Sequence, residues 1–271
     1  MKVIPSVSIA VFLTLAFSSF SLAKEEDWIR ILLLGDSTTE GSVPRRLKPE
    51  GPHLEHVVRH LLHTDPEIPR CKVYNEGVSG EYIHRLLESG RYERDVASME
   101  KLDYIFIRYG INDNAKRENF EKNFPADFHL LLSRLREDHP DALLIPTTVI
   151  PFSNEEVSAK INKLVRQVAE KEKLEVFDLY PRYAAELEKG YHMLNYRRYP
   201  LEKIPKQHHE WLAPRVTGGR VEVMDNELDA LFGHLPGWFG DRHPNLAGYN
   251  VIADETAKYL TPILKKRLAK K

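Results

Sequence analysis

Short apolar runs alternate with amphipathic stretches along most of the chain. Five of the apolar runs have the length of a buried strand: residues 28–34, 72–74, 102–107, 142–149 and 174–179. The first run is apolar except for Arg30, which is typical of a strand covered on both faces. Between and after these runs, the spacing of apolar residues predicts helices over residues 53–63, from near 81, 127–136, 154–173 and 245–268.

Strands that alternate with helices of this length predict a parallel sheet with helices on both faces. The expected fold class is therefore α/β, a three-layer α/β/α sandwich around a central parallel five-stranded sheet. Sheets of this kind bind ligands at the carboxyl ends of their strands. Polar and glycine-rich blocks directly follow the first three strands, so we expect the functional site at that edge.

The alternation stops in a segment of about residues 190–240 that is rich in aromatic and basic residues. These residues include Tyr196, Arg197, Arg198, Tyr199, His208, His209, Trp211, Arg215 and Trp238. A long irregular segment in a compact domain is usually functional, which favours an insertion that covers or borders the active site. An ordinary surface excursion that packs its own aromatic side chains explains the pattern equally well.

The first 23 residues have the pattern of a secretory signal peptide. Lys2 provides a positive start, residues 7–17 are mostly apolar, and residues 21–23 (Ser-Leu-Ala) match the small-x-small pattern of a cleavage site. We therefore expect an exported protein, periplasmic or secreted, with residues 24–271 as a single domain. The alternative is an uncleaved N-terminal anchor, against which the shortness of the apolar run counts.

Charge and cysteine content narrow the classes of function. The formal net charge is −1 and there is no basic block, so the sequence gives no electrostatic argument for a nucleic-acid partner. Cys71 is the only cysteine, which excludes an intrachain disulfide. Because Cys71 opens a predicted strand, we expect it to be a buried, unreactive thiol.

Two polar blocks contain the residue types of a serine nucleophile and its base. Residues 35–38 (Gly-Asp-Ser-Thr) follow the first strand, where a serine hydroxyl can project above the sheet edge and a helix start offers backbone N–H groups to an oxyanion. Residues 241–245 (Asp-Arg-His-Pro-Asn) precede the last helix, and a histidine beside a carboxylate is suited to act as a general base. Taken alone, each block also fits a helix cap or an ordinary loop.

Two further blocks follow the second and third strands. Residues 75–80 (Asn-Glu-Gly-Val-Ser-Gly) contain glycines that let backbone N–H groups approach a substrate oxygen closely. Residues 110–113 (Gly-Ile-Asn-Asp) supply an asparagine whose amide can donate a second hydrogen bond to the same oxygen. Each block is common on its own, but four of them in this order predict one catalytic site.

Together, the four blocks resemble those of the GDSL/SGNH hydrolases, and the resemblance covers nearly all of residues 24–271 outside the insertion. It implies a flavodoxin-like fold and ester hydrolysis without a metal or other cofactor. Carried over to this sequence, it implies Ser37 as nucleophile and His243 as base. The implied oxyanion donors are the backbone N–H groups of Ser37 and Gly80 and the side chain of Asn112. Gly80 is preferred to Gly77 because its Ser-Gly pair matches the block.

The acid of the expected triad departs from the family pattern. The usual position lies three residues before the histidine and is occupied here by Gly240, whereas Asp241 lies two residues before it. We favour Asp241 as the orienting acid because a loop can present either spacing. Asp229 or a backbone carbonyl in its place is the alternative.

A histidine-rich helix, residues 53–63, raises the possibility of a metal site. His53, His56, His60 and His63 fall on adjacent parts of one face, but Glu55 is the only carboxylate in the run. The adjacent pair His208 and His209 points in two directions. We therefore expect solvated helix residues and no metal.

The aromatic and basic residues of the insertion suit stacking on sugar rings and binding of acidic or sulfated polysaccharide. The Gly-Asp-Ser-Thr form also resembles that of some carbohydrate acetylesterases of the superfamily. The sequence thus favours an O-acetylesterase that acts on carbohydrate. A lipase, lysophospholipase or thioesterase is the alternative among enzymes, and a non-catalytic glycan-binding module is the alternative from another class.

Overall fold

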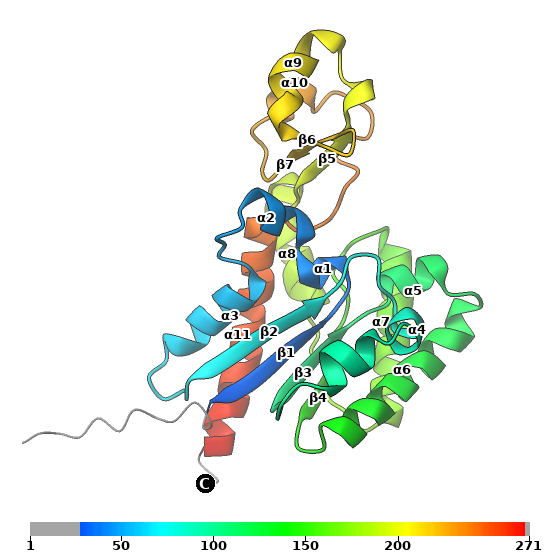
Figure 1. Ribbon diagram of the computed structural model, residues 1–271, viewed down its shortest axis with the longest axis vertical. Helices are drawn as coiled ribbons and strands as arrows, with labels where there is room; N and C mark the ends of the chain where they lie inside the picture. The colour runs from blue at the N-terminus through cyan, green and yellow to red at the C-terminus, as the bar shows by residue number, and fades with distance from the viewer. Residues whose placement is uncertain (1–27, 269–271) are drawn as a thin grey trace, which may run out of the picture.

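The structure, a computed structural model, describes residues 28–268, so the predicted signal peptide, residues 1–23, lies outside the described residues. A four-stranded parallel sheet forms the centre of the molecule, in the order β2-β1-β3-β4 (Figure 1). Its strands are β1 (Ile29–Gly35), β2 (Cys71–Gly77), β3 (Tyr104–Arg108) and β4 (Leu143–Pro146). All five residues of β3 are buried, because helices cover both faces of the sheet.

Two helical layers enclose the sheet (Figure 1). One face is covered by α3 (Leu54–His63), α8 (Tyr180–Gly190) and α11 (Leu246–Leu268). The other face is covered by α4 (Ile83–Glu88), η2 (Tyr92–Ala97), α6 (Phe120–Asp138) and α7 (Glu155–Lys171). The side chain of Asn154 caps α7 by accepting from the backbone N–H of Val157, as predicted. Three short helices, α1 (Ser37–Glu40), α2 (Ser42–Leu47) and α5 (Ile111–Lys116), follow β1 and β3 at the carboxyl edge.

The structure thus confirms an α/β fold with a parallel sheet but not the expected fifth strand. Residues 174–179 form only a single parallel bridge, between Phe177 and Thr147. The pairing stops there because the Thr148 hydroxyl donates to the Asp178 carboxylate and accepts from the backbone N–H of Tyr180, where α8 begins. The segment was predicted as a strand because its apolar residues, among them Phe177, are still buried.

The insertion is more regular than its sequence suggests. It contains a three-stranded antiparallel sheet of β5 (Arg197–Pro200), β7 (Arg220–Val223) and β6 (Val216–Thr217). Two short α-helices accompany the sheet, α9 (His209–Leu212) and α10 (Asp229–Phe232). The remaining elements are the 3-10 helices η3 (Tyr191–Leu194), η4 (Leu201–Lys203), η5 (Lys206–His208) and η6 (Ala213–Arg215). Its own apolar cluster comprises Tyr199, Ile204, Leu212, Val221, Val223, Leu228, Phe232 and Trp238. In Figure 1 it stands beyond the carboxyl ends of β1 and β2. The expectation of an irregular segment was wrong because strands of two to four residues that carry several charges leave no clear alternation.

No helix among residues 28–268 combines the length and the apolar character that a membrane span requires. Cys71 is buried, as predicted, and burial together with the nearby Asp103 charge raises the pKa of its thiol to about 12. A thiol of this kind is almost fully protonated at neutral pH and therefore unreactive.

Candidate active site

The register of the sheet brings the three strand-end blocks to one edge. Gly35 at the end of β1 pairs with Gly77 on one side and with Arg108 on the other. Ser37 and Ser79 each lie two residues beyond this row, as does Gly110 in the third block. Because all three strands are parallel, the blocks emerge on the same side of the sheet, as the sequence predicted.

Ser37 is the first residue of α1, and the buried Asp36 forms the N-cap of that helix. The Asp36 carboxylate accepts from the backbone N–H and from the hydroxyl of Thr38, both at 2.8 Å. Burial raises the pKa of Asp36, although the bonds from Thr38 oppose this effect. The Tyr249 hydroxyl of α11 donates to the Ser37 carbonyl at 3.2 Å. The backbone at Ser37 is thus held both by the Asp36 cap and by Tyr249 of α11.

A buried arginine supports α1 from the neighbouring strand. Arg108 of β3 donates to the Thr38 carbonyl at 2.6 Å and to the Thr39 hydroxyl at 3.1 Å. Burial lowers the pKa of Arg108, whereas the nearby Asp36 raises it. Gly77 permits this close packing, because a Cβ there would lie 2.3 Å from the backbone nitrogen of Glu40 in α1. The turn that carries Ser37 therefore rests directly on the sheet.

His243 connects Ser37 to Asp241 by hydrogen bonds. Its Nε2 lies 2.9 Å from the Ser37 hydroxyl oxygen, and its Nδ1 lies 2.6 Å from the Asp241 carboxylate. A carboxylate can only accept, so Nδ1 carries the proton and Nε2 is left to accept from the Ser37 hydroxyl. This tautomer is the one that a general base requires.

The two-residue spacing between acid and histidine is geometrically sufficient. Asp241 accepts both from the His243 ring and, at 3.1 Å, from the His243 backbone N–H. Burial alone would raise the pKa of Asp241, but the bonds from His243 and the Arg198 charge outweigh it and lower that pKa. Asp229, the alternative acid, binds Arg197 and the Trp238 indole inside the insertion instead.

Two aromatic rings flank the imidazole. Tyr196 stacks on one face of His243, with ring centroids 5.4 Å apart, and Phe152 packs its edge against the ring at 4.7 Å. The Tyr196 backbone N–H also donates to the His243 carbonyl, and the adjacent residues Asn195 and Pro244 form an antiparallel β-bridge. The start of the insertion thus pairs with the histidine loop and fixes its position.

The insertion supplies a second contact that the sequence did not reveal. Arg198 of β5 donates through Nε to the second Asp241 oxygen at 2.9 Å. The neighbouring Glu222 of β7 forms an ion pair with Arg46 of α2, which ties the insertion to the segment that follows Ser37. Arg198 was noted only as part of a basic, aromatic segment, because no local pattern indicates a partner 43 residues away.

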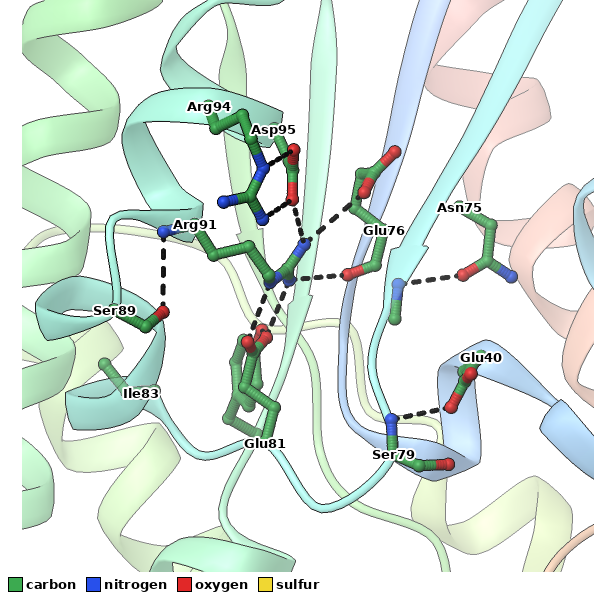
Figure 2. Close-up of polar contacts among 12 residues, drawn as sticks. Glu40, Asn75, Glu76, Ser79, Glu81, Ile83, Ser89, Arg91, Arg94 and Asp95 are labelled. Atoms are coloured by element: carbon green, nitrogen blue, oxygen red, sulfur yellow. Dashed lines mark hydrogen bonds and ion pairs between the residues drawn. The ribbon is translucent and has the colours of Figure 1, made fainter.

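The loop that carries Gly80 is held to both neighbouring blocks. The Ser79 backbone N–H donates to the Glu40 carboxylate of α1 at 2.6 Å (Figure 2). Lys116 of α5 donates to the Gly80 carbonyl at 2.6 Å. Gly80 has a φ of 76°, a left-handed conformation that favours glycine. The structure therefore brings Gly80 to the edge that also carries Ser37 and α5.

A buried ion pair anchors the far end of the same loop. Arg91 binds both carboxylate oxygens of Glu81, at 2.7 and 2.6 Å, and donates to the Glu76 carbonyl at 3.0 Å (Figure 2). The Tyr109 hydroxyl, next to the third block, donates to Glu81 at 2.7 Å. Residues 76–81 are thus fixed at both ends by side chains from elsewhere in the fold.

The third block contains a buried donor without a partner. The Asn112 side-chain nitrogen has no hydrogen-bond acceptor within the described residues. The adjacent Asp113 accepts from the backbone N–H groups of Gly110 and Ile83, both at 3.0 Å. Burial raises the pKa of Asp113 to about 7. Buried amides are normally paired, so an unpaired one at a catalytic edge is a candidate donor to a ligand.

Two histidines of the histidine-rich segment, His53 and His63, form contacts with the backbone of neighbouring segments. His63 accepts from the backbone N–H of Cys71 at 2.8 Å, and the ring of His53 lies within 3.2 Å of the Pro49 carbonyl. Over residues 28–268, no three or more His, Cys, Asp or Glu side chains gather in a way that could hold a metal ion.

Comparisons with known proteins identify the family and similar folds. Residues 33–251 match the model of the GDSL-like lipase/acylhydrolase family. A putative GDSL-like lipase from Parabacteroides merdae is similar in structure, with a TM-score of 0.55 and 16% identity, over 86% of this chain and 95% of that one. The acetylxylan esterase Axe2 from Geobacillus stearothermophilus has a TM-score of 0.54 and 19% identity, over 85% of this chain and 93% of that one.

One curated relative matches part of the sequence. The uncharacterized protein YpmR of Bacillus subtilis (strain 168) is 29% identical over 137 residues, which are 45% of this chain and 52% of that protein. The chain therefore matches about half the length of this relative. The family match covers most of the chain and includes all four blocks in full. The chain therefore belongs to the GDSL-like lipase/acylhydrolase family.

Proposed function

We propose that the protein is an exported serine esterase that removes acetyl groups from carbohydrate, with Ser37, His243 and Asp241 as its catalytic residues. The observation that supports the catalytic part most strongly is the continuous chain of hydrogen bonds from the Ser37 hydroxyl through His243 to Asp241, at 2.9 and 2.6 Å. Nucleophile, base and orienting acid are in contact without any rearrangement.

The proposed reaction proceeds through an acyl-enzyme. His243 takes the hydroxyl proton as the Ser37 oxygen attacks the ester carbonyl carbon, and Asp241 stabilises the imidazolium. The C–O bond to the alcohol then breaks, and the alcohol oxygen leaves with the proton from His243. Water attacks the acyl-enzyme by the same route and releases the acid and free Ser37.

We assign the oxyanion donors to the backbone N–H groups of Ser37 and Gly80 and to the Asn112 amide. Three observations support this assignment: Ser37 lies at a helix start, Gly80 lies in a loop pinned to that helix, and the Asn112 nitrogen is unpaired. Donors aimed at the developing negative charge typically contribute about 3 kcal/mol each to catalysis.

Carbohydrate is the favoured alcohol because of the surroundings of His243. A cavity of about 490 Å³ adjoins the imidazole, and polar and basic side chains from the insertion and the last loop make up much of its lining. Such a lining suits a hydrophilic alcohol better than a long acyl chain. One structural neighbour is an acetylxylan esterase, which supports the choice of an acetyl ester.

The catalytic proposal is tested by covalent labelling of the purified mature chain. A fluorophosphonate should label the protein at Ser37, and the Ser37→Ala variant should neither be labelled nor hydrolyse p-nitrophenyl acetate, with an unchanged melting temperature. A non-catalytic glycan-binding module would leave the hydroxyl unlabelled. An active Ser37→Ala variant would remove Ser37 from its role.

Acyl specificity is tested with a series of p-nitrophenyl esters. We expect kcat/KM to be highest for acetate and to fall for octanoate and palmitate. A strong preference for long chains would favour the lipase or lysophospholipase alternative, and release of thiol from acyl thioesters at a higher rate would favour a thioesterase.

Export is proposed from the first 23 residues alone. Expression of the full chain in a bacterial host should give a periplasmic or secreted product whose mass corresponds to cleavage after Ala23. A product that retains residues 1–23 in the membrane fraction would favour the uncleaved anchor.

A further inference from the structure

The cavity beside His243 carries an excess of positive charge. It is bordered by β5, β7 and the loop that ends at His243, and its basic side chains are Arg198, Lys203, Arg220 and Arg242. Among the described residues that line it, Asp241 is the single carboxylate, and both Arg198 and His243 already bind that carboxylate. The net charge of the whole chain is only −1, so this concentration of cations is a local feature.

Two of these cations have no counter-charge in the described part of the chain. Lys203 and Arg220 are exposed, and neither side chain forms a hydrogen bond or ion pair within residues 28–268. The nearest carboxylate along β7, that of Glu222, is occupied by Arg46. Cations gathered in a concave site without internal partners favour an anionic ligand, because like charges otherwise repel each other there.

The position of the cavity relative to the chemistry indicates which part of a substrate it holds. In the proposed reaction His243 delivers its proton to the oxygen of the departing alcohol, so the alcohol part must lie on the His243 side of Ser37. His243 and Asp241 form one wall of the cavity. The cavity therefore faces the alcohol part rather than the acyl part.

The dimensions and remaining lining suit a sugar. The volume of about 490 Å³ lies within the range of small-molecule sites, roughly 300–1,000 Å³. Phe152, Pro200 and Pro236 provide apolar edges between the basic residues, and such edges pack against the carbon face of a sugar ring.

We propose that this cavity is a subsite for a carboxylate or sulfate group on the sugar alcohol of the ester, so that the enzyme prefers acidic saccharides. The inference rests on the proposed esterase function and narrows its substrate class. Arg220 and Lys203 bind the anionic group, while Arg198 links the same subsite to the catalytic acid.

Competitive inhibition of p-nitrophenyl acetate hydrolysis tests the subsite independently of the natural acyl group. An oligogalacturonate and a sulfated oligosaccharide of equal length should inhibit the wild-type enzyme, and a neutral xylo-oligosaccharide should inhibit at least about tenfold more weakly. The inhibition constant of the acidic sugars should rise between about 50 mM and about 500 mM salt, because salt screens exposed charges. Glycerol phosphate serves as the fourth inhibitor and represents a lipid headgroup.

The variants Lys203→Gln and Arg220→Gln should each raise the inhibition constant of the acidic sugars by about three- to tenfold. The value of kcat/KM for p-nitrophenyl acetate, measured in the same variant, is the reference for its basal activity. Lys206→Gln, which removes an exposed cation of the insertion outside the cavity, is the matched control and should change nothing.

The outcomes separate the two proposals. Equal inhibition by acidic and neutral sugars, or unchanged inhibition in both variants, would overturn the subsite while leaving the esterase intact. Stronger inhibition by glycerol phosphate than by either acidic sugar would overturn the saccharide and favour a phospholipid. Absence of p-nitrophenyl acetate hydrolysis in the wild type would instead contradict the proposed function.

Discussion

The α/β layers and the insertion contribute to the same site in different ways. The layers carry Ser37, Gly80 and Asn112 in the blocks that follow three paired strands, where Arg108 of β3 holds α1 and Lys116 of α5 holds the Gly80 carbonyl. The insertion has a separate apolar core and reaches the site through its first residues, where Arg198 binds the acid.

This difference indicates a division of roles. In the proposed mechanism, the groups that meet the ester carbonyl are positioned by a sheet that many residues stabilise together. The acid–base pair is held from the insertion side, and the cavity for the alcohol is built largely by the insertion. If the proposed function holds, catalysis depends on a segment that also lines the proposed substrate cavity, and substitutions can separate these two contributions.

The largest effect is expected for the core of the insertion. Trp238 is almost fully buried there, and its indole donates to Asp229 at 2.7 Å. The Trp238→Ala variant should lose about 3–5 kcal/mol of local stability. Hydrogen exchange should show loss of protection within residues 196–240 but not in β1 or β3, with a parallel loss of esterase activity, because His243 pairs with that segment.

Phe128→Ala is the control within the layers, since Phe128 of α6 is fully buried in the apolar cluster on that face of the sheet. It should lower protection across the sheet as well as in the insertion. If Trp238→Ala lowers protection throughout residues 28–268 to the same degree, the insertion and the layers unfold as one unit and the comparison fails.

The second effect concerns the layers alone. The Asn112→Ala variant should lower kcat by about 10²–10³-fold, equivalent to about 3 kcal/mol, because it removes one oxyanion donor. The melting temperature should stay the same or rise slightly, since the amide nitrogen has no partner in the folded chain. The control is Asn114→Ala in the same helix. A reduction of kcat by less than about threefold in Asn112→Ala would remove the amide from the oxyanion site.

A smaller effect is expected at the contact between the two regions. The Arg198→Met variant should lower kcat for the uncharged p-nitrophenyl acetate by about tenfold with little change in KM, because it removes a charge-assisted bond of about 1.5 kcal/mol to Asp241. Arg198→Lys should restore part of the loss. Arg215→Met, which breaks the ion pair with Glu227 elsewhere in the insertion, should have no effect on kcat. An unchanged kcat in Arg198→Met would confine Arg198 to the subsite.

A dependence of stability on pH is also expected within the layers. Burial raises the pKa of Asp113 from 3.8 to about 7, so between these values the unfolded chain ionises while the folded chain keeps the proton. Folding is therefore disfavoured by this group as the pH rises through that window.

The Asp113→Asn variant lacks this dependence. The free energy of unfolding of the variant minus that of the wild type should therefore be more positive at pH 8 than at pH 5, by about 1–3 kcal/mol. Urea unfolding at both pH values measures the difference. A difference that is constant with pH would mean that Asp113 is ionised in the folded protein at both.

Much of the layered fold and of the strand-end chemistry was predictable from the sequence. Apolar runs of strand length mark the four strands, and each block follows its strand directly, so the parallel arrangement alone gathers Ser37 and the second and third blocks. The resemblance of the blocks to those of the GDSL/SGNH hydrolases implied His243 as the base of Ser37, and their contact at 2.9 Å agrees with that expectation.

The insertion was not predictable in the same way, because its stability comes from contacts between distant residues. Arg197 is a strand residue with 1% exposure that pairs with Asp229, yet in sequence it is one of two adjacent arginines. Lys203 and Arg220 lie in one cavity although 17 positions separate them, and neither belongs to a periodic pattern. The fifth strand was overpredicted for the converse reason, since apolar character alone does not specify backbone pairing.

The short distance along the chain between Asp241 and His243 has a consequence for protein engineering. The carboxylate binds both the ring and the main chain of the histidine, so the pair closes on itself as a compact turn. The orientation of the ring relative to the carboxylate is thus set within three residues, whereas the insertion positions the turn as a whole. Residues 241–243 are therefore a candidate for transplantation into a scaffold that already presents an exposed serine.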